Sequence, residues 1–103
     1  MLEVKKEDGK TIIKTGSRID TGNAVQFEQE LLPLLNEGGM KLVIDCDDLT
    51  YMASSGLRVI QKAMRSLVQI KGEISMINVN PPIFKVLDMT GFLQFMKVEQ
   101  KKG

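Results

Sequence analysis

The sequence predicts a mixed α/β domain in which one β-sheet, mostly parallel after an N-terminal hairpin, carries helices packed upon it. Short apolar runs typical of buried strands alternate with longer segments of helical periodicity. The expected element order is ββαβαβαβ, and strand–helix–strand units of this length form right-handed crossovers between parallel strands. With 103 residues, of which 43% are hydrophobic, the chain can build one core, so we expect a single domain over residues 1–103.

The first two strands are expected to form a hairpin. Residues 2–5 alternate apolar and polar side chains, residues 10–14 do so more loosely, and Glu7-Asp8-Gly9 between them is a turn signal. Later segments of apolar or alternating character predict further strands at residues 42–44, 73–79 and 95–98. The residues from about 99 to 103 are expected to form a frayed tail.

Two helices are indicated by signals at their ends. The first is expected over residues 23–37, where Asn23 can cap the start. Pro33 lies within this span and removes a backbone hydrogen bond, so we expect a kink or a restart there. The second covers residues 81–89. It begins with two prolines, which suit a first turn, and Gly91 is its expected C-cap.

The strongest periodic pattern follows Ser54 and predicts a third, broadly amphipathic helix. Apolar residues fill one half of the helical wheel, namely Leu57, Val59, Ile60, Ala63, Met64, Leu67, Val68 and Ile70. Polar residues fill the other half, namely Arg58, Gln61, Lys62, Arg65, Ser66 and Gln69. An apolar arc of roughly 180° is wide enough to lie on a sheet.

Several classes of function are excluded by residues that the sequence lacks. It contains no histidine, which rules out histidine-based catalysis and histidine-ligated metals, and its one cysteine, Cys46, cannot form an intrachain disulfide or a thiolate zinc site. Neither GxxxxGK[ST] nor GxGxxG occurs, and the serines lack the GxSxG and SxxK spacings of serine nucleophiles. Most familiar enzyme classes are therefore excluded.

The charge and hydropathy of the chain bear on its partners and location. With a net charge of +1, the chain has no strong positive field that would attract nucleic acid or an anionic membrane. No apolar run approaches the roughly 20 residues of a membrane span, and the first residues lack the apolar region of a signal peptide. We expect a cytoplasmic protein without nucleic-acid or membrane partners, and Cys46 as a small, unreactive core residue.

Two serines and a glycine, Ser54-Ser55-Gly56, stand between a strand-like run and the amphipathic helix. A serine here is most often an N-cap, whose hydroxyl oxygen accepts a hydrogen bond from a free backbone N–H. Gly56 in the first turn costs helix stability, which indicates the close approach of a neighbouring group. In the functional interpretation, the junction lies at the carboxyl edge of a parallel sheet, where the positive end of a helix would tolerate a phosphate on serine.

Four stretches of the chain match the motifs of one known family in order. Ser54-Ser55-Gly56-Leu57 is similar to the motif D-S-S-G-[LI], with Ala53 in place of the aspartate. The other three are residues 18–24, similar to G-x-[LI]-D-x-x-x-A without its leading glycine, a buried strand with its exit at 42–52, and a closing helix with its glycine at 86–92. The chain thus resembles a STAS domain, in particular a bacterial anti-sigma-factor antagonist of the partner-switching type.

The resemblance implies a regulator that is not an enzyme and needs no cofactor. In that family the first motif serine is phosphorylated by a partner that is both anti-sigma factor and serine kinase. This position is Ser54 here, with Ser55 as the second choice. The unmodified antagonist binds the kinase and frees a sigma factor, and a phosphoserine phosphatase reverses the modification.

The partner-binding surface is expected to surround this junction. It would comprise Asp20, Thr21, Ser54, Ser55, Gly56, Arg58, Lys62 and Arg65. Asp20 is similar to the loop aspartate beside the family's phosphorylation site. The three basic residues follow i, i+4 and i+7 spacing and form a stripe along the helix that acidic groups of a kinase could meet, although a solvated helix face has the same pattern.

Two other functions remain open on the sequence. A STAS module that senses a small ligand or scaffolds a signalling complex without being phosphorylated is favoured by Ala53, because the motif's carboxylate is missing beside the acceptor hydroxyl. A hydrolase using Ser54 would lack a base of suitable pKa. We expect no metal site from the carboxylates typical of strand ends and turns, which are Asp20, Asp45, Asp47 and Asp48.

Overall fold

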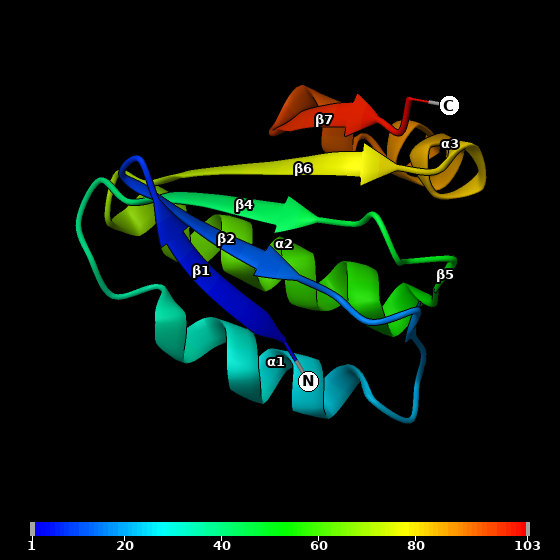
Figure 1. Ribbon diagram of the computed structural model, residues 1–103, viewed down its shortest axis with the longest axis horizontal. Helices are drawn as coiled ribbons and strands as arrows, with labels where there is room; N and C mark the ends of the chain where they lie inside the picture. The colour runs from blue at the N-terminus through cyan, green and yellow to red at the C-terminus, as the bar shows by residue number, and fades with distance from the viewer. Residues whose placement is uncertain (1, 103) are drawn as a thin grey trace.

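A five-stranded sheet forms the framework of the computed structural model, which describes residues 2–102 (Figure 1). Its strands, in spatial order, are β1 (Glu3–Glu7), β2 (Lys10–Lys14), β4 (Lys41–Asp45), β6 (Glu73–Val79) and β7 (Lys97–Gln100). The first pair is antiparallel and the other three pairs are parallel. The mixed, mostly parallel sheet predicted from the sequence is confirmed.

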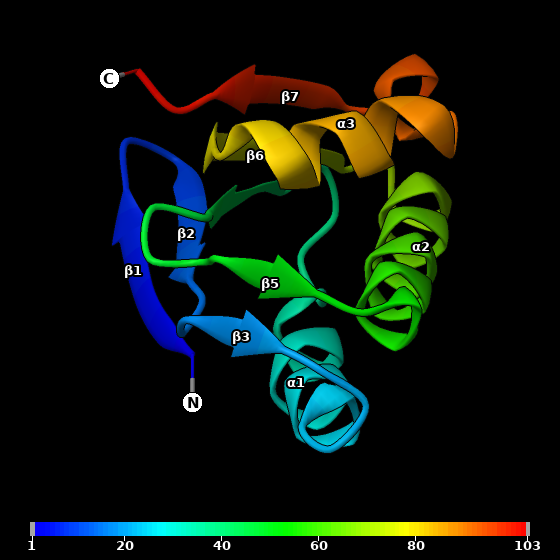
Figure 2. The same cartoon turned by 90° about the vertical axis from the view of Figure 1, so that its right-hand side faces the viewer.

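Helices cover one face of the sheet and leave the other open, as an end-on view shows (Figure 2). The α-helices are α1 (Ala24–Leu31), α2 (Ser54–Gln69) and α3 (Pro81–Met89), and two short 3₁₀ helices are η1 (Leu32–Leu34) and η2 (Phe92–Gln94). The helix-facing side chains of the three central strands form the core, and Ile13, Ile44 and Met76 are fully buried. No helix within residues 2–102 combines the length and apolar character needed to cross a bilayer.

Two very short strands were not predicted from the sequence. β3 (Arg18–Ile19) and β5 (Tyr51–Met52) pair in parallel and form a separate two-stranded sheet. Segments of two residues show no measurable alternation, so only the tertiary pairing reveals them. Their pairing brings the β3–α1 loop beside the start of α2, where the N–H of Ala53 donates to the carbonyl of Ile19 at 2.7 Å.

The first helix is shorter than predicted. α1 ends at Leu31, and the segment containing Pro33 continues as the 3₁₀ helix η1. Proline cannot donate the backbone hydrogen bond of a regular α-helix, which explains the change of helix type at the expected restart. Asn23 occupies the N-cap position, but its side chain makes no capping hydrogen bond, so its predicted capping role is wrong.

Helix α2 is confirmed, but one part of its predicted apolar face is not buried. Val59, Ile60 and Leu67 lie in the core. Val68, which the helical wheel places on the apolar side, is 74% exposed. It lies at the edge of the apolar arc, beyond the area that the sheet covers.

The C-terminal elements follow the prediction with shifted boundaries. The side chain of Asn80 caps α3 by accepting from the N–H of Ile83 at 3.0 Å, and Gly91, with φ of +83°, adopts the left-handed conformation that ends the helix. β7 begins at Lys97 instead of residue 95 and runs to Gln100, and the N–H of Lys101 donates to Val79. Residues 99–101 therefore extend the sheet and do not form a frayed tail.

Gly56 is the expected point of close approach. A Cβ atom at this position would lie 2.6 Å from Cγ2 of Ile19 and 3.1 Å from Cγ of Met52. We predict that Gly56→Ala destabilises the fold by about 1–3 kcal/mol through overpacking, partly offset by the better helix propensity of alanine. Denaturant unfolding measures the change. Gly16→Ala is the matched control, because a Cβ there meets nothing within 4 Å, and an equal loss in both variants would contradict the packing argument.

Candidate functional site

The candidate site lies at the carboxyl end of the parallel strands, where α2 begins (Figures 1 and 2). Ser54 is the first residue of α2, and its side chain is exposed. Thr21, in the adjacent β3–α1 loop, is also exposed, whereas Gly56 is buried beneath the first turn. Ser54 and Thr21 are therefore open to solvent on neighbouring segments, which we call the rim, and Gly56 is a packing residue beneath them.

Ala53, and not a serine, occupies the N-cap position of α2. Its backbone is extended, with φ −81° and ψ 166°, and its methyl group supplies no capping acceptor. The interpretation of the serines as N-caps is therefore wrong, because the junction is displaced by one residue. The N–H groups of Ser54 and Ser55 are in the first turn, where a helix offers no preceding carbonyl, so this helix end attracts negative charge.

The two serines differ in their access to solvent. The Oγ atom of Ser55 is buried and has no hydrogen-bond partner among residues 2–102, while Ser54 is exposed. A buried hydroxyl can be reached by another protein only if the first turn opens. The geometry therefore favours Ser54 over Ser55 as an acceptor for chemistry from outside.

The loop that carries Asp20 is held in one conformation by reciprocal hydrogen bonds. The N–H of Asn23 donates to Oδ1 of Asp20 at 3.0 Å, and the N–H of Asp20 donates to Oδ1 of Asn23 at 2.8 Å. The Nδ2 group of Asn23 also donates to the carbonyl of Arg18 at 2.9 Å. These bonds engage the side chain of Asn23, which explains why it does not cap α1.

Asp20 presents a charged carboxylate next to the start of α2. The N–H of Asn23 lowers the pKa of Asp20, and the guanidinium of Arg18, whose Nε lies 3.4 Å from Oδ2, contributes in the same direction. A lowered folded-state pKa stabilises the folded loop at neutral pH, and this contribution is lost only as the pH falls through that pKa. The carboxylate is thus ionised under physiological conditions.

Arg18 and Tyr51 form a part of the rim that the sequence did not reveal. The guanidinium of Arg18 lies over the ring of Tyr51, 4.6 Å from its centroid, and Tyr51 is 45% exposed. The two residues face each other because β3 and β5 are paired at this register. No sequence signal connects them, since they are 33 residues apart and each strand is only two residues long.

The predicted basic stripe on α2 separates into three environments. Arg58 is exposed near the site. Lys62 forms an ion pair with Glu28 of α1, with Nζ 2.7 Å from Oε1, so it joins the two helices. Arg65 lines a groove at the other end of α2. Arg58 alone of these three is both free of an ion pair within the described residues and close to Ser54.

The remaining carboxylates and the cysteine are engaged in the fold. Asp45 accepts hydrogen bonds from the N–H of Asp47 and the amide of Asn78, and Asp48 pairs with Lys14. Across residues 2–102, histidine, cysteine, aspartate and glutamate form no cluster that could hold a metal ion. Cys46 is buried, and burial raises the pKa of its thiol to about 12, as expected for an unreactive core residue.

Comparisons with known proteins place this chain in a family. The sequence profile described as the STAS domain matches residues 1–103. The chain belongs to the STAS domain family. It is 31% identical over 101 residues to BtrV of Bordetella bronchiseptica, which carries the name of an anti-sigma factor antagonist, covering 98% of this chain and 87% of BtrV.

Other relatives of this STAS domain have the same kind of name. It is 23% identical to an anti-sigma-B factor antagonist of Staphylococcus aureus, over 96% of this chain and 92% of that protein. A solved structure described as an anti-sigma factor antagonist from Thermotoga maritima superposes with a TM-score of 0.86 at 22% identity, covering 96% of this chain and 86% of the other. Unphosphorylated SpoIIAA superposes with a TM-score of 0.79 at 19% identity, covering 95% and 87%. These structures confirm the fold.

The unfilled N-cap generates a test of the local structure. Ala53→Asn and Ala53→Asp each supply an acceptor for the free N–H groups of the first turn, and we predict that Asn stabilises the fold by about 0.5–2 kcal/mol. The stabilisation by Ala53→Asp should be smaller, because the charged Asp20 in the adjacent loop repels the new carboxylate. Thermal or denaturant unfolding of the two variants measures the difference, and Ala53→Val is the control without a cap. A gain with valine equal to that with asparagine would show that capping is not the cause.

Proposed function

We propose that this STAS domain, a relative of anti-sigma factor antagonists, binds an anti-sigma factor that is also a serine kinase and is switched off by phosphorylation of Ser54. In this proposal the unmodified protein occupies the kinase and frees a sigma factor. The observation that carries it is the exposed hydroxyl of Ser54, at the first residue of α2, which the fold does not use for capping. The hydroxyl is available for modification without loss of a structural hydrogen bond.

The local electrostatics support a modification that leaves the fold intact. A phosphate on Ser54 would add about −1.5 to −2 charge at the positive end of the α2 dipole, near N–H groups that have no intrahelical acceptor. Arg58 lies one helical turn further along and can interact with a phosphate at i and i+4 spacing. The phosphorylated helix should therefore remain folded.

The same site explains how phosphorylation could change binding. The ionised Asp20 lies in the loop that is hydrogen-bonded to the residue before Ser54, so one carboxylate is already close to the modified position. Bringing a dianion into an interface that had formed around a neutral hydroxyl costs several kcal/mol through desolvation and through repulsion by acidic groups nearby. Since about 1.4 kcal/mol corresponds to a tenfold change in affinity, a loss of two or more decades follows.

The proposal includes a phosphoserine phosphatase that restores the binding form, and it requires no catalytic group in this chain. It also locates the protein in the cytoplasm, where a kinase has ATP. The hydroxyl of Ser54 has no histidine to activate it, because the sequence contains none. The antagonist acts by exposing or blocking a surface.

A second candidate function is supported by Ala53. The aspartate of the resembled motif would stand beside the acceptor hydroxyl, and alanine supplies neither its charge nor its hydrogen bonds. The protein could then bind a signalling partner constitutively, as a scaffold or ligand sensor that is not phosphorylated. The two functions share a binding surface and differ in whether a kinase modifies it.

Phosphorylation of Ser54 is tested directly with serine-kinase anti-sigma factors from the source organism. We predict that one of them, incubated with ATP, places a single phosphate on Ser54, and that the product or Ser54→Asp binds this kinase at least about 100-fold more weakly. Mass spectrometry locates the phosphate and calorimetry measures the affinity. Ser66→Asp, at the other end of α2, is the control for added charge. Tight binding without any phosphate on Ser54 would favour the scaffold.

The role of the basic residues is tested by separating binding from structure. We predict that Arg58→Glu slows association with the kinase by about tenfold, because it reverses charge at the rim, and leaves the unfolding free energy nearly unchanged. Lys62→Glu removes the ion pair with Glu28, so it is compared with the double exchange Lys62→Glu and Glu28→Lys, which restores that pair. Rates measured by surface plasmon resonance that are unchanged in Arg58→Glu would exclude a contribution of this residue to docking.

A further inference from the structure

The short sheet of β3 and β5 carries an exposed pair of side chains beside the start of α2. Successive side chains of a strand point to opposite faces, and the inward-facing ones here are Ile19, which is buried, and Met52, which is partly buried. Arg18 and Tyr51 are direct partners in the register, so both point away from the interior. The two strands lie at the end of the molecule that faces the viewer in Figure 2.

The ring of Tyr51 is held on one side and open on the other. The guanidinium of Arg18 lies 4.6 Å from the ring centroid, while 45% of Tyr51 remains exposed. Arg18 is itself held by Asp20, with Nε 3.4 Å from Oδ2. An aromatic side chain that is already held in place loses little conformational freedom when a partner binds it.

Tyr51 lies close to the hydroxyl that a kinase would have to reach. Ser54 follows Tyr51 by three residues, so their Cα atoms are no more than about 11 Å apart. An interface of ordinary size covers roughly 800 Å² on each partner, which is a patch about 30 Å across. A kinase that reaches Ser54 therefore also covers Tyr51, near the centre of the contact. Aromatic side chains in that position contribute a large share of the binding energy in protein interfaces.

We propose that Tyr51 is the anchor residue through which the anti-sigma factor recognises this STAS domain, and that Arg18 positions it. This inference rests on the proposed function, because it takes the anti-sigma factor as the partner. The partner would offer a pocket with apolar walls to the open side of the ring. The anchor takes no part in chemistry at Ser54, so it contributes to binding whether or not a kinase modifies that hydroxyl.

A purely structural role for the pair would be to join β3 to β5. Main-chain hydrogen bonds already do so, because the N–H of Ala53 donates to the carbonyl of Ile19 at 2.7 Å. The N–H of Thr50 donates to the carbonyl of Ser17 at 2.8 Å in the same way. These bonds do not depend on the side chains of the pair, and an exposed cation–π contact adds little to stability.

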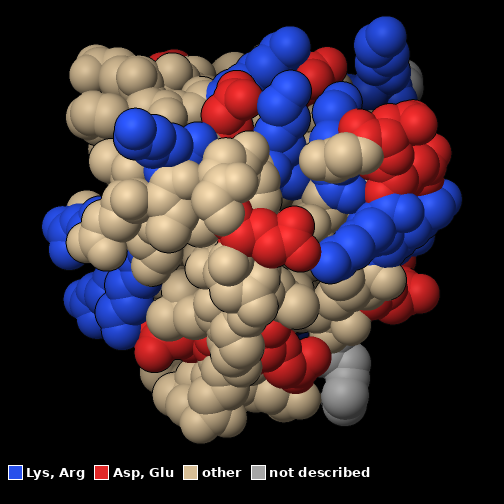
Figure 3. Space-filling view, turned by 90° about the vertical axis from the view of Figure 1, so that its left-hand side faces the viewer, with Lys and Arg blue, Asp and Glu red and all other residues tan. Residues whose placement is uncertain are grey.

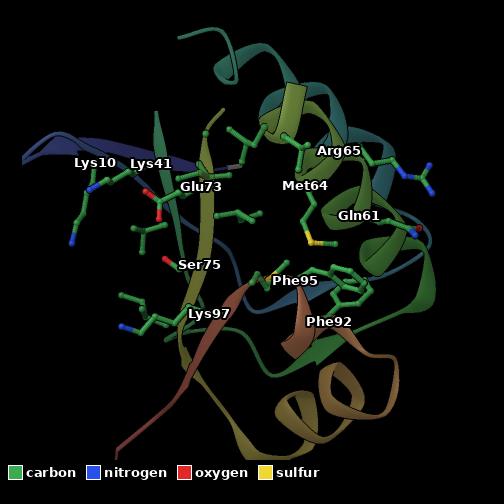
Figure 4. Close-up of a pocket in the computed structure, with 18 of the residues that line it drawn as sticks. Lys10, Lys41, Gln61, Met64, Arg65, Glu73, Ser75, Phe92, Phe95 and Lys97 are labelled. Atoms are coloured by element: carbon green, nitrogen blue, oxygen red, sulfur yellow. The ribbon is translucent and has the colours of Figure 1, made fainter. Parts of the chain in front are cut away.

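Phe95 provides a matched control for an exposed aromatic side chain. It is 73% exposed and lines a groove at the far end of α2 (Figure 4). It precedes β7 by two residues, so it lies at the amino end of the parallel strands. This end faces the viewer in Figure 3, where acidic and basic side chains are spread over the surface. A partner centred on Ser54 would not reach it.

The experiment measures by calorimetry how the full chain binds a serine-kinase anti-sigma factor. We expect Tyr51→Ala to weaken binding by at least about 30-fold, and Tyr51→Phe, which keeps the ring, by no more than about fivefold. Phe95→Ala should bind as tightly as the original chain. In phosphorylation assays Tyr51→Ala should raise KM and leave kcat nearly unchanged, because the ring serves docking and not phosphoryl transfer.

Denaturant unfolding shows whether each variant is folded under the conditions of the assay. Tyr51→Thr repeats the truncation with a residue that favours strands. A loss of affinity that the folded alanine and threonine variants share is therefore not caused by a weakened β5.

A double-mutant cycle separates positioning by Arg18 from direct contact with the partner. Arg18→Ala should weaken binding by about tenfold in the original chain and by less than about twofold when residue 51 is already alanine. Tyr51 is the sole tyrosine, and the chain has no tryptophan, so the fluorescence of the free protein reports on this ring. Its anisotropy should fall in Arg18→Ala, because the guanidinium no longer holds the ring.

Two results would overturn the anchor while leaving the proposed function intact. One is binding by Tyr51→Ala that is as tight as that of the original chain, and the other is an equal loss in Phe95→Ala. An equal effect of Arg18→Ala in both backgrounds would overturn its positioning role. If no anti-sigma factor binds the unmodified original chain, the proposed function itself fails, so the two failures are distinguishable.

Discussion

The close contact between Ile19 and Gly56 is the constraint on which the candidate site depends. Ile19 lies so near the first turn of α2 that a Cβ at position 56 would be 2.6 Å from its Cγ2 atom. The hydrogen bond from Ala53 to the Ile19 carbonyl fixes the same pair of segments. Together they hold the loop of Asp20 beside Ser54, although the two residues are far apart in the sequence. A bulkier residue at position 56 would separate them.

The position of the N-cap decides what the serines can do. Because Ala53 caps the helix geometrically without a side-chain acceptor, the first turn keeps unsatisfied N–H groups, and Ser54 is left facing solvent. Had Ser54 been the cap, its hydroxyl would have been bonded to the backbone, and modifying it would have cost the helix its cap. Because the N-cap is Ala53 and not Ser54, a modification of the Ser54 hydroxyl does not remove a helix cap.

Helix α2 is exposed at both ends, whereas its central part is packed into the fold. Its central residues pack on the sheet, and Lys62 ties it to α1 through Glu28. The two ends are exposed for different reasons. The N-terminal end borders the paired strands β3 and β5, and the C-terminal end extends past the part of the sheet edge that β7 covers. The two ends of this one rigid helix therefore carry separate exposed features, namely the hydroxyl of Ser54 and the apolar side chain of Val68.

The sequence by itself determined the fold class, the long amphipathic helix, the buried strands and the family, because these depend on periodicity and on motifs that are local in the chain. It also indicated that Gly56 meets a neighbour. It did not determine which residue caps α2, since a shift of one residue changes the apolar pattern very little. The pairing of β3 with β5, the stacking of Arg18 on Tyr51, the division of the basic stripe and the exposure of Val68 were decided only by tertiary structure. Each depends on contacts between segments distant in sequence, and the periodicity of one segment carries no information about its neighbour in space.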